Sequence, residues 1–318
     1  MALSERASDH RPNNPRAIQI FALGTGAIGL EVIIYRQTLA DLRPLVIVSS
    51  VDYPMPPSEA FCEQMWQAGL QVIFIRRPGF GGTPGLPKAL LGEAEISNGA
   101  AVSAEAALLV QLLRRMVLKN TVLVGLGTSN PVCFRVAHLC QDVQLLVCAN
   151  PIFNQNTIGV FQPAWFRTLL DLTMRTKSGV RIAEVGLKHQ LRKDPLKFYQ
   201  DVLEKCRGDS RYAQENQSDL LQASRLLLNV DAETFLYDVR MSLLPDPALS
   251  DSYFSDLNAV ILSGEETSDA WKTQLNSESR RLALPIRYGS SGDIFVPYTS
   301  PQALLSLIDD YGAFAPNV

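Results

Sequence analysis

The feature that most constrains the fold is an apolar strand that turns directly into a helix. The run Val122–Leu126 is apolar apart from a single glycine, Gly125. Residues 127–129 (Gly-Thr-Ser) follow at once, and from Asn130 onward the apolar side chains recur at helical spacing. A strand joined to a helix by so short a turn predicts an α/β protein.

Apolar runs and helical patterns alternate along the first half of the chain. Two strands joined by a Gly-Thr-Gly turn are expected within residues 17–35. The alternation that follows is typical of a mostly parallel sheet covered by helices. Further strands are expected at Leu45–Val48, Val72–Ile75, Val122–Leu126 and Leu145–Ala149, and helices at residues 58–68 and 102–118.

Residues 122–137 resemble the nucleophile elbow of the α/β-hydrolases, in which an apolar strand runs into Gly-x-Ser-x-Gly and then into a helix. In this alignment Gly125 is the first glycine, Gly127 takes the place of the nucleophile and Ser129 takes the place of the second glycine. Glycine adopts positive φ freely, so Gly127 can keep the sharp turn without its strain. In an alternative register Ser129 is the nucleophile, and Pro131 then stands where the second glycine belongs.

The other two members of the Ser-His-Asp triad also depart from the family pattern. The resemblance places the histidine in a loop before the last helix, and Asp293 stands there instead. The acid position is held by Thr267, with Asp269 two residues further as a substitute acid. No catalytic residues are therefore expected at the family's positions. The three histidines of the chain lie elsewhere, at His10, His138 and His189.

Two further segments resemble the family outside the elbow. Residues 44–50 resemble the strand that ends in His-Gly before the oxyanion loop, with Ser49 and Ser50 at those positions. Residues 72–83 resemble the next strand and its Asp-x-x-Gly-x-Gly-x-Ser loop, with Arg76 in place of the acid. The resemblance implies the α/β-hydrolase fold, with a mostly parallel central sheet flanked by helices and an inserted helical cap.

The resemblance also implies a ligand site at the elbow. The family's oxyanion donors are main-chain N–H groups, which survive a change of side chain. Here they would be the N–H groups of Val51 and Thr128, and the positive end of the helix near Thr128 favours a carboxylate, phosphate or polarised carbonyl. The expected ligand-binding residues around the elbow are Ser50, Val51, Gly127, Thr128 and Asp293.

Residues 152–240 abandon the strand–helix alternation and resemble the helical cap that many α/β-hydrolases insert after the sixth strand. Phe153 and Trp165 at its start are expected to wall an apolar pocket. The chain therefore divides into a disordered tail (1–16), a core (17–151 and 241–318) and a cap (152–240). Helices of the cap are expected at Trp165–Arg175, Val180–Leu191, Pro195–Cys206, Ser218–Leu228 and Ala232–Leu243.

The composition and charge of the chain limit the kinds of partner that it is expected to bind. The chain has 318 residues, 47% of them hydrophobic, with a formal net charge of −3 and an isoelectric point near 5.7. It has no basic stripe for nucleic acid, and residues 17–35 are too polar for a membrane span. The five cysteines lack paired metal-ligand spacing, so neither a metal nor a cofactor is expected. The polar N-terminus lacks the apolar core of a signal peptide, which favours a cytoplasmic protein.

These observations favour a non-catalytic protein with a hydrolase-like fold. It would bind a small, partly apolar molecule or a protein partner, as a sensor or regulator. One alternative is a hydrolase that uses Ser129. The other is an enzyme with rebuilt acid–base chemistry, such as a lyase, isomerase or cyclase. The candidate groups for that chemistry are Asp293, Glu265, Glu266, Asp269 and Arg76. The charge of the ligand depends on where Asp293 points, and the sequence leaves the oligomeric state open.

Overall fold

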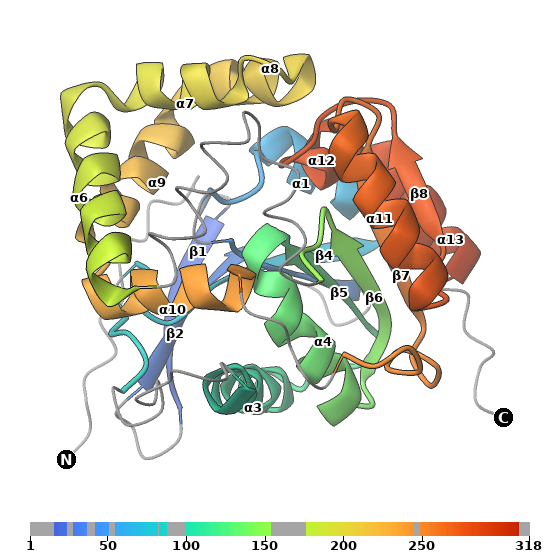
Figure 1. Ribbon diagram of the computed structural model, residues 1–318. Coiled ribbons are helices and arrows are strands. Elements are labelled where there is room, and N and C mark those ends of the chain that lie inside the picture. Colours follow the sequence, from blue (N-terminus) through green and yellow to red (C-terminus); the bar gives the residue numbers. More distant parts are fainter. Residues whose placement is uncertain are drawn as a thin grey trace, which may run out of the picture.

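An eight-stranded sheet forms the centre of the molecule, and helices lie on both of its faces (Figure 1). The computed structural model describes residues 16–23, 28–36, 42–50, 55–81, 83–87, 99–153, 176–243 and 249–311. Within these ranges the strand order is β1-β2-β4-β3-β5-β6-β7-β8. The strands are β1 (Arg16–Leu23), β2 (Ile28–Tyr35), β3 (Arg43–Val48), β4 (Leu70–Arg76), β5 (Thr121–Leu126), β6 (Val143–Ala149), β7 (Ala259–Gly264) and β8 (Ile286–Gly289).

Most of the sheet is parallel. The β1–β2 and β2–β4 pairs are antiparallel, whereas every pair from β4 across to β8 is parallel. Parallel strands collect their carboxyl ends at one edge, and in open α/β sheets ligands bind beyond that edge. The prediction of a mostly parallel sheet flanked by helices is confirmed.

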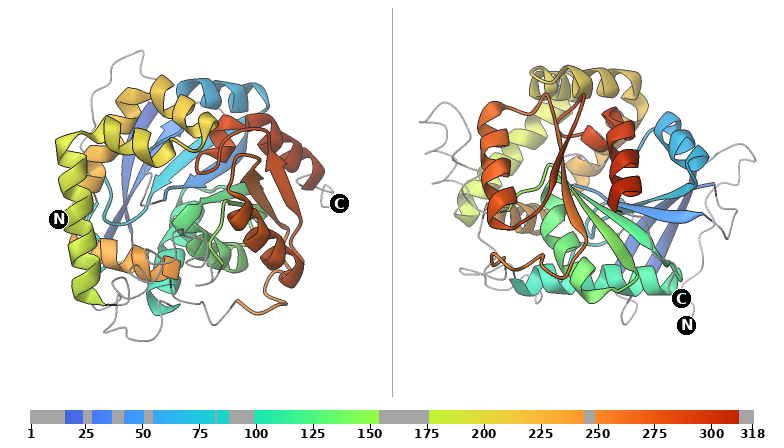
Figure 2. Two further views of the ribbon diagram at one scale, coloured as in Figure 1. Left: turned by 45° about the horizontal axis from the view of Figure 1, so that its top comes forward. Right: turned by 90° about the vertical axis from the view of Figure 1, so that its right-hand side faces the viewer.

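Helices cover both faces of the sheet (Figure 2). An apolar layer on each face holds them against it. Because both faces are covered, β5 and β7 are buried at every residue, in place of the alternation seen in half-exposed strands. The helices α3 (Gly99–Arg115), α4 (Asn130–Leu139) and α11 (Asp269–Arg281) cover one face. The helices α1 (Glu59–Gln67), α12 (Val296–Thr299) and α13 (Pro301–Tyr311) pack on the other.

Between β6 and β7 the described chain forms a helical segment, residues 176–243, beyond the carboxyl edge of the sheet (Figure 1). Its helix α10 contacts the turn after β5, and α8 contacts α12. The first two helices of the segment have local N-caps, since the side chains of Thr176 and Asp194 accept backbone N–H groups at the starts of α6 and α7. The helices are α6 (Lys177–Lys193), α7 (Pro195–Leu203), α8 (Arg207–Glu215), α9 (Gln217–Asn229) and α10 (Ala232–Leu243).

The observed elements extend most of the expected ones by a few residues and add the helices α8, α11 and α12. Helix α8 was not predicted because its sequence is mostly polar, with Tyr212 and Ala213 as its buried apolar residues. The strand β1 begins at Arg16, which the sequence placed in the tail, and Arg16 forms an ion pair with Asp219 (2.8 Å). The helix expected at Trp165–Arg175 and the Gly-Thr-Gly turn lie outside the described residues.

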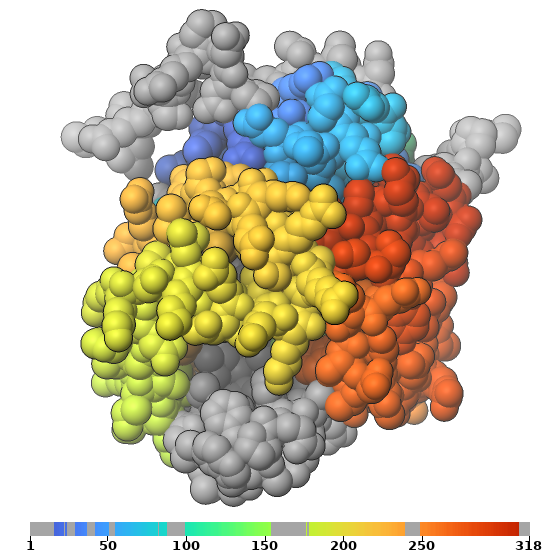
Figure 3. Space-filling model, turned by 90° about the horizontal axis from the view of Figure 1, so that it is seen from above, coloured from blue at the N-terminus to red at the C-terminus, as the bar shows by residue number. Residues whose placement is uncertain are grey.

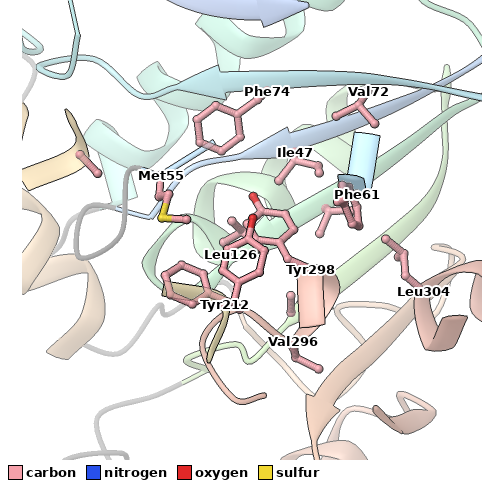
Figure 4. Close-up of a cluster of buried hydrophobic side chains, with 14 of the residues drawn as sticks. Ile47, Met55, Phe61, Val72, Phe74, Leu126, Tyr212, Val296, Tyr298 and Leu304 are labelled. Carbon is pink, nitrogen blue, oxygen red and sulfur yellow. The ribbon is translucent and has the colours of Figure 1, made fainter. Parts of the chain in front are cut away.

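A buried aromatic cluster ties α8 to the rest of the molecule (Figure 4). The ring centroid of Tyr212 lies 5.5 Å from that of Tyr298 and 5.3 Å from that of Phe295. Tyr298 in turn packs edge-on against Phe61 of α1, at 5.1 Å. The Tyr212 hydroxyl accepts a hydrogen bond from the backbone N–H of Ser58 (2.9 Å), the residue that caps α1. Aromatic contacts of this kind join α8, α12 and α1 above the sheet.

A buried ion cluster joins three separate segments of the chain. Arg77, directly after β4, donates from Nε to Glu105 Oε1 (2.6 Å) and from Nη2 to Glu105 Oε2 (3.1 Å). Its Nη1 donates to Asp238 of α10, and the Tyr237 hydroxyl donates to Glu105 Oε2 (2.9 Å). All four side chains are buried. Two carboxylates therefore share one guanidinium, and the cluster links β4, α3 and α10.

Replacing Arg77 by methionine is expected to lower the free energy of unfolding by about 3–5 kcal/mol, because Glu105 and Asp238 would stay buried without a cation. Chemical denaturation measures the loss. The matched control is Arg211→Met, since Arg211 pairs with Glu215 on the surface and such pairs contribute little. An equal loss in the two variants would contradict a structural role for the cluster.

Candidate functional site

The turn after β5 is a strand–turn–helix elbow without a side chain at its tip. Gly127 has a φ of +45°, in the left-handed region that favours glycine. Residues 127–129 form a short 3-10 turn, η1, and α4 begins at Asn130. Among the described residues, only Ser50 comes within 4 Å of the position that a Cβ on Gly127 would take, with its Oγ at 3.4 Å. The described surroundings therefore leave room for a side chain there.

Ser129, the nucleophile of the alternative register, is a structural residue. It has no exposed surface, and its Oγ accepts the backbone N–H of Leu126 (2.8 Å). The same oxygen lies 3.0 Å from the carbonyl oxygen of Val48 and 2.9 Å from that of Leu126, so its proton is held by the backbone. The hydroxyl of Ser129 is thus enclosed by backbone groups in this structure, and its use as a nucleophile stays a prediction.

Three polar side chains form a hydrogen-bonded chain beside Gly127. The hydroxyl oxygens of Ser50 and Thr128 lie 3.1 Å apart, and the carboxylate of Asp238 is hydrogen-bonded to Thr128. Burial raises the pKa of Asp238, against the opposing effects of the Arg77 charge and of the bonds from Arg77 and Thr128. An ionised carboxylate only accepts hydrogen bonds, so Thr128 donates to Asp238 and accepts from Ser50.

Asp293 and Thr267, which the sequence resemblance assigns to the histidine and acid positions, contact each other. Thr267 Oγ1 donates to Asp293 Oδ1 over 2.6 Å, and Asn150 Nδ2 donates to the same oxygen over 2.8 Å. Burial raises the pKa of Asp293 despite these two bonds. The substitute acid Asp269 is exposed at the start of α11, so the structure brings Thr267 to Asp293 and leaves Asp269 outside.

Asn130 connects the elbow to the next strand. Its Nδ2 donates to the carbonyl oxygen of Gly127 (2.8 Å) and to that of Ala149 (3.2 Å), the last residue of β6. The following residue, Asn150, holds Asp293. The candidate site therefore runs along the carboxyl ends of β3, β5, β6 and β7, and the loop after β8 carries its last member.

The loop that carries Asp293 is clamped by two acids. Asp209 of α8 is fully buried and accepts the backbone N–H groups of Asp293 (3.1 Å), Ile294 (2.7 Å) and Phe295 (3.1 Å). Burial raises the pKa of Asp209 to about 6, although these bonds oppose the shift. Glu266 accepts the N–H groups of Gly208 (2.7 Å) and Gly292 (2.9 Å), and Glu265 is exposed. Glu266 thus acts as a tether in this structure.

The remaining predicted residues lie apart from this row. Phe153 stacks on Phe134 of α4 at 5.6 Å and belongs to the apolar layer on the α3–α4 face, so the expectation that it walls a ligand pocket is wrong. Arg76 is buried and pairs with Glu31 of β2, while its Nε and Nη2 have no hydrogen-bond partner among the residues that the structure describes. Val51 and Trp165 lie outside the described residues.

Three buried acids of the site were not predicted as site residues. The sequence does indicate that Glu105 is buried, because it lies three residues after Val102 and four before Leu109 on the apolar face of α3. No such indication exists for Asp238 and Asp209, since each meets its partners through contacts between distant parts of the chain. Such contacts leave no local pattern in a single sequence.

Two negative findings apply to the described ranges only. No group of three or more His, Cys, Asp or Glu side chains in them could hold a metal ion. No helix in the same part of the chain is long and apolar enough to cross a membrane.

Comparison with known proteins identifies the fold. No family model and no curated protein matches the sequence. Solved structures match over nearly the whole chain. An esterase from Exiguobacterium antarcticum shares 11% identity at a TM-score of 0.59, covering 92% of this chain and 98% of its own. A bromoperoxidase from Bacillus anthracis shares 14% identity at a TM-score of 0.56, covering 93% and 99%.

An enol-lactonase from Burkholderia xenovorans LB400 is similar to the same extent, with 12% identity, a TM-score of 0.58 and coverage of 92% and 98%. These neighbours are α/β-hydrolase-fold enzymes. The chain therefore has the α/β-hydrolase fold. At such low identity the likeness establishes the fold and leaves the activity to be argued from the site.

We expect Gly127→Ser to lower the free energy of unfolding by about 1–3 kcal/mol, because a serine at this positive φ is strained. The variant should also show no esterase activity, since no histidine among the described residues bonds to the groups around the new hydroxyl. Urea denaturation and an aryl-ester assay measure the two outcomes. Gly186→Ser on α6 is the control, because nothing lies within 4 Å of its Cβ position and no stability should be lost. Equal stability of Gly127→Ser and the parent would contradict the strained elbow.

The clamp predicts a pH dependence of stability. The folded state raises the pKa of Asp209 from 3.8 to about 6, so the stability it contributes is full below pH 3.8 and is lost as the pH rises through about 6. This shift corresponds to about 3 kcal/mol. Because asparagine does not titrate, the unfolding free energy of Asp209→Asn minus that of the parent should rise by most of that amount from pH 4 to pH 7. The exposed control Asp256→Asn should show no such slope, and a flat difference for Asp209→Asn would refute the assignment.

Proposed function

We propose that the protein is a non-catalytic member of the α/β-hydrolase fold that binds a small, partly apolar molecule as a sensor or regulator. The observation that carries the proposal is Gly127, a glycine at φ +45° at the tip of the elbow. The family's chemistry needs a hydroxyl at this position, and here there is no side chain to supply it.

The residues at the other two triad positions support the same conclusion. A serine nucleophile needs a base that accepts its proton and returns it to the leaving group. At the histidine position Asp293 is engaged by Thr267 and Asn150, which hold one carboxylate oxygen in place. This arrangement has no imidazole to relay protons, as the triad requires. It instead presents a carboxylate in a fixed position, which suits the binding of a ligand.

In this proposal the helical segment acts as the cap. Seen from above, α6 and α8 border a recess on the face beyond the strand ends (Figure 3). The helix α10 contacts the elbow turn, and Asp238 from that helix reaches Thr128. A ligand seated over Gly127 would thus touch both the core and the cap. The three similar structures carry enzyme names, and loss of the nucleophile turns the same position into a receptor site.

One observation favours a second candidate function, an enzyme with rebuilt chemistry. The hydrogen-bonded chain from Ser50 through Thr128 to Asp238 runs in the direction that would carry a proton away from Ser50. Ser50 Oγ also lies 3.4 Å from the Cβ position of Gly127, close to where the family's nucleophile would begin. In this candidate Ser50 replaces the missing serine, and Asp238 is the general base.

Activity tests separate the two candidates. The non-catalytic proposal predicts no hydrolysis of short-chain aryl esters and no covalent labelling by a fluorophosphonate, because no activated hydroxyl stands at the elbow. Mass spectrometry after long incubation measures labelling, with Ser50→Ala and Ser129→Ala as site controls. Stoichiometric labelling that disappears in Ser50→Ala would overturn the proposal and support the second candidate. Labelling that disappears in Ser129→Ala would instead restore the alternative register.

Binding is tested by thermal stabilisation with small aliphatic molecules that differ in their polar head. A saturable rise in melting temperature with at least one of them is expected, since a ligand that binds the folded state alone stabilises it. If no compound has this effect, the small-molecule role fails and a role limited to protein partners takes its place.

A further inference from the structure

We propose that the ligand's polar head is a hydrogen-bond donor, specifically a protonated amine, and that Ser50 and Asp293 accept its hydrogen bonds. This inference rests on the proposed function and names the chemical class of its ligand. It reverses the sequence-based expectation that the elbow favours an anion.

The first acceptor is Ser50, whose hydroxyl proton is already committed. Asp238 is held by Arg77 and takes the hydrogen of Thr128, which leaves the Thr128 oxygen to accept from Ser50 over 3.1 Å. Ser50 therefore turns its proton toward Thr128 and has only lone pairs left for another partner. Its oxygen also lies 3.4 Å from the Cβ position of Gly127, so those lone pairs border the space that the missing side chain vacates.

The second acceptor is the outer oxygen of Asp293. Both described donors, Thr267 and Asn150, bind Oδ1, and no hydrogen bond in the described structure reaches Oδ2. The carboxylate is held in place by these two bonds, and Asp209 fixes the main chain beneath it by accepting the backbone N–H of Asp293. A half-buried carboxylate with one bonded and one open oxygen favours a cationic donor above any other head group.

The charged groups around Ser50 and Asp293 also favour a cationic ligand. The ion cluster behind Thr128 contains two carboxylates, Glu105 and Asp238, and a single guanidinium, Arg77. Arg76 is matched by Glu31, so it adds no net charge. Lys272 acts on Asp293 through its charge only, and its ammonium donates to the carbonyl of Glu265 (2.5 Å). Among the described residues, no lysine or arginine side chain bonds to Ser50 or Asp293, so acceptors and negative charge dominate.

The experiment compares three probes of equal chain length at neutral pH: octylammonium, 1-octanol and octanoate. Isothermal titration calorimetry measures the affinity of each for the full chain. We expect octylammonium to bind with 1:1 stoichiometry and at least tenfold more tightly than octanoate, with octanol between them. Octanoate binding as tightly as octylammonium would overturn the inference and leave the proposed function standing. Binding of none of the three would refute the proposed function and the inference with it.

Two variants locate the acceptors. Asp293→Asn removes the charge with little change of shape and should weaken octylammonium at least tenfold while leaving octanoate equal or tighter. Ser50→Ala should weaken octylammonium and octanol severalfold. The control Asp256→Asn removes an exposed carboxylate elsewhere and should change neither affinity, which excludes a general effect of net charge. Unchanged octylammonium binding in Asp293→Asn would overturn the assignment, and circular dichroism confirms that each variant is folded.

Discussion

The guanidinium of Arg77 is buried at the end of β4 and is balanced by Glu105 from α3 and Asp238 from α10. A buried cation is tolerated only while its partners stay in place. The ion pair between Arg77 and Asp238 therefore holds α10 against the sheet near the elbow. Asp238 also accepts a hydrogen bond from Thr128. The ion pair with Arg77 therefore sets which of the two hydroxyls, Thr128 or Ser50, donates to the other. The helical segment, the sheet and the candidate site thus all depend on the ion cluster around Arg77.

The charge at the strand ends changes what an α/β-hydrolase elbow can bind. The N-terminus of a helix such as α4 stabilises an anion by about 0.3–1 kcal/mol. Two like charges about 4 Å apart repel by about 4 kcal/mol at an effective dielectric near 20. With carboxylates at Asp238 and Asp293, the helix terminus is outweighed wherever an anion would approach either of them. The N-terminus of α4 therefore lies in an acidic setting.

The fold was predictable because its elements have strong local signals. Apolar runs marked the central strands, and a glycine in the nucleophile's place predicted the positive φ of Gly127, which the structure has. Side-chain surroundings were harder to predict. The expectation for Phe153 failed because an aromatic residue after a strand packs equally well on either face of the sheet. The role of Asp238 in the site could not be predicted because its partner Arg77 lies 161 residues away in the sequence, and no local pattern indicates such a contact.

The bonds from Asp209 to residues 293–295 also bear on the order in which the site assembles. They join positions 84 to 86 residues apart, and the three N–H groups have this single carboxylate as their common acceptor. Contacts of such long sequence separation form late, because the entropy of closing the loop is lost before the contact compensates for it. The turn that presents Asp293 thus takes its final shape only after α8 has docked. In a nascent chain, residues 293–295 are synthesised after α8, so the helix that supplies their common acceptor is already made when they emerge.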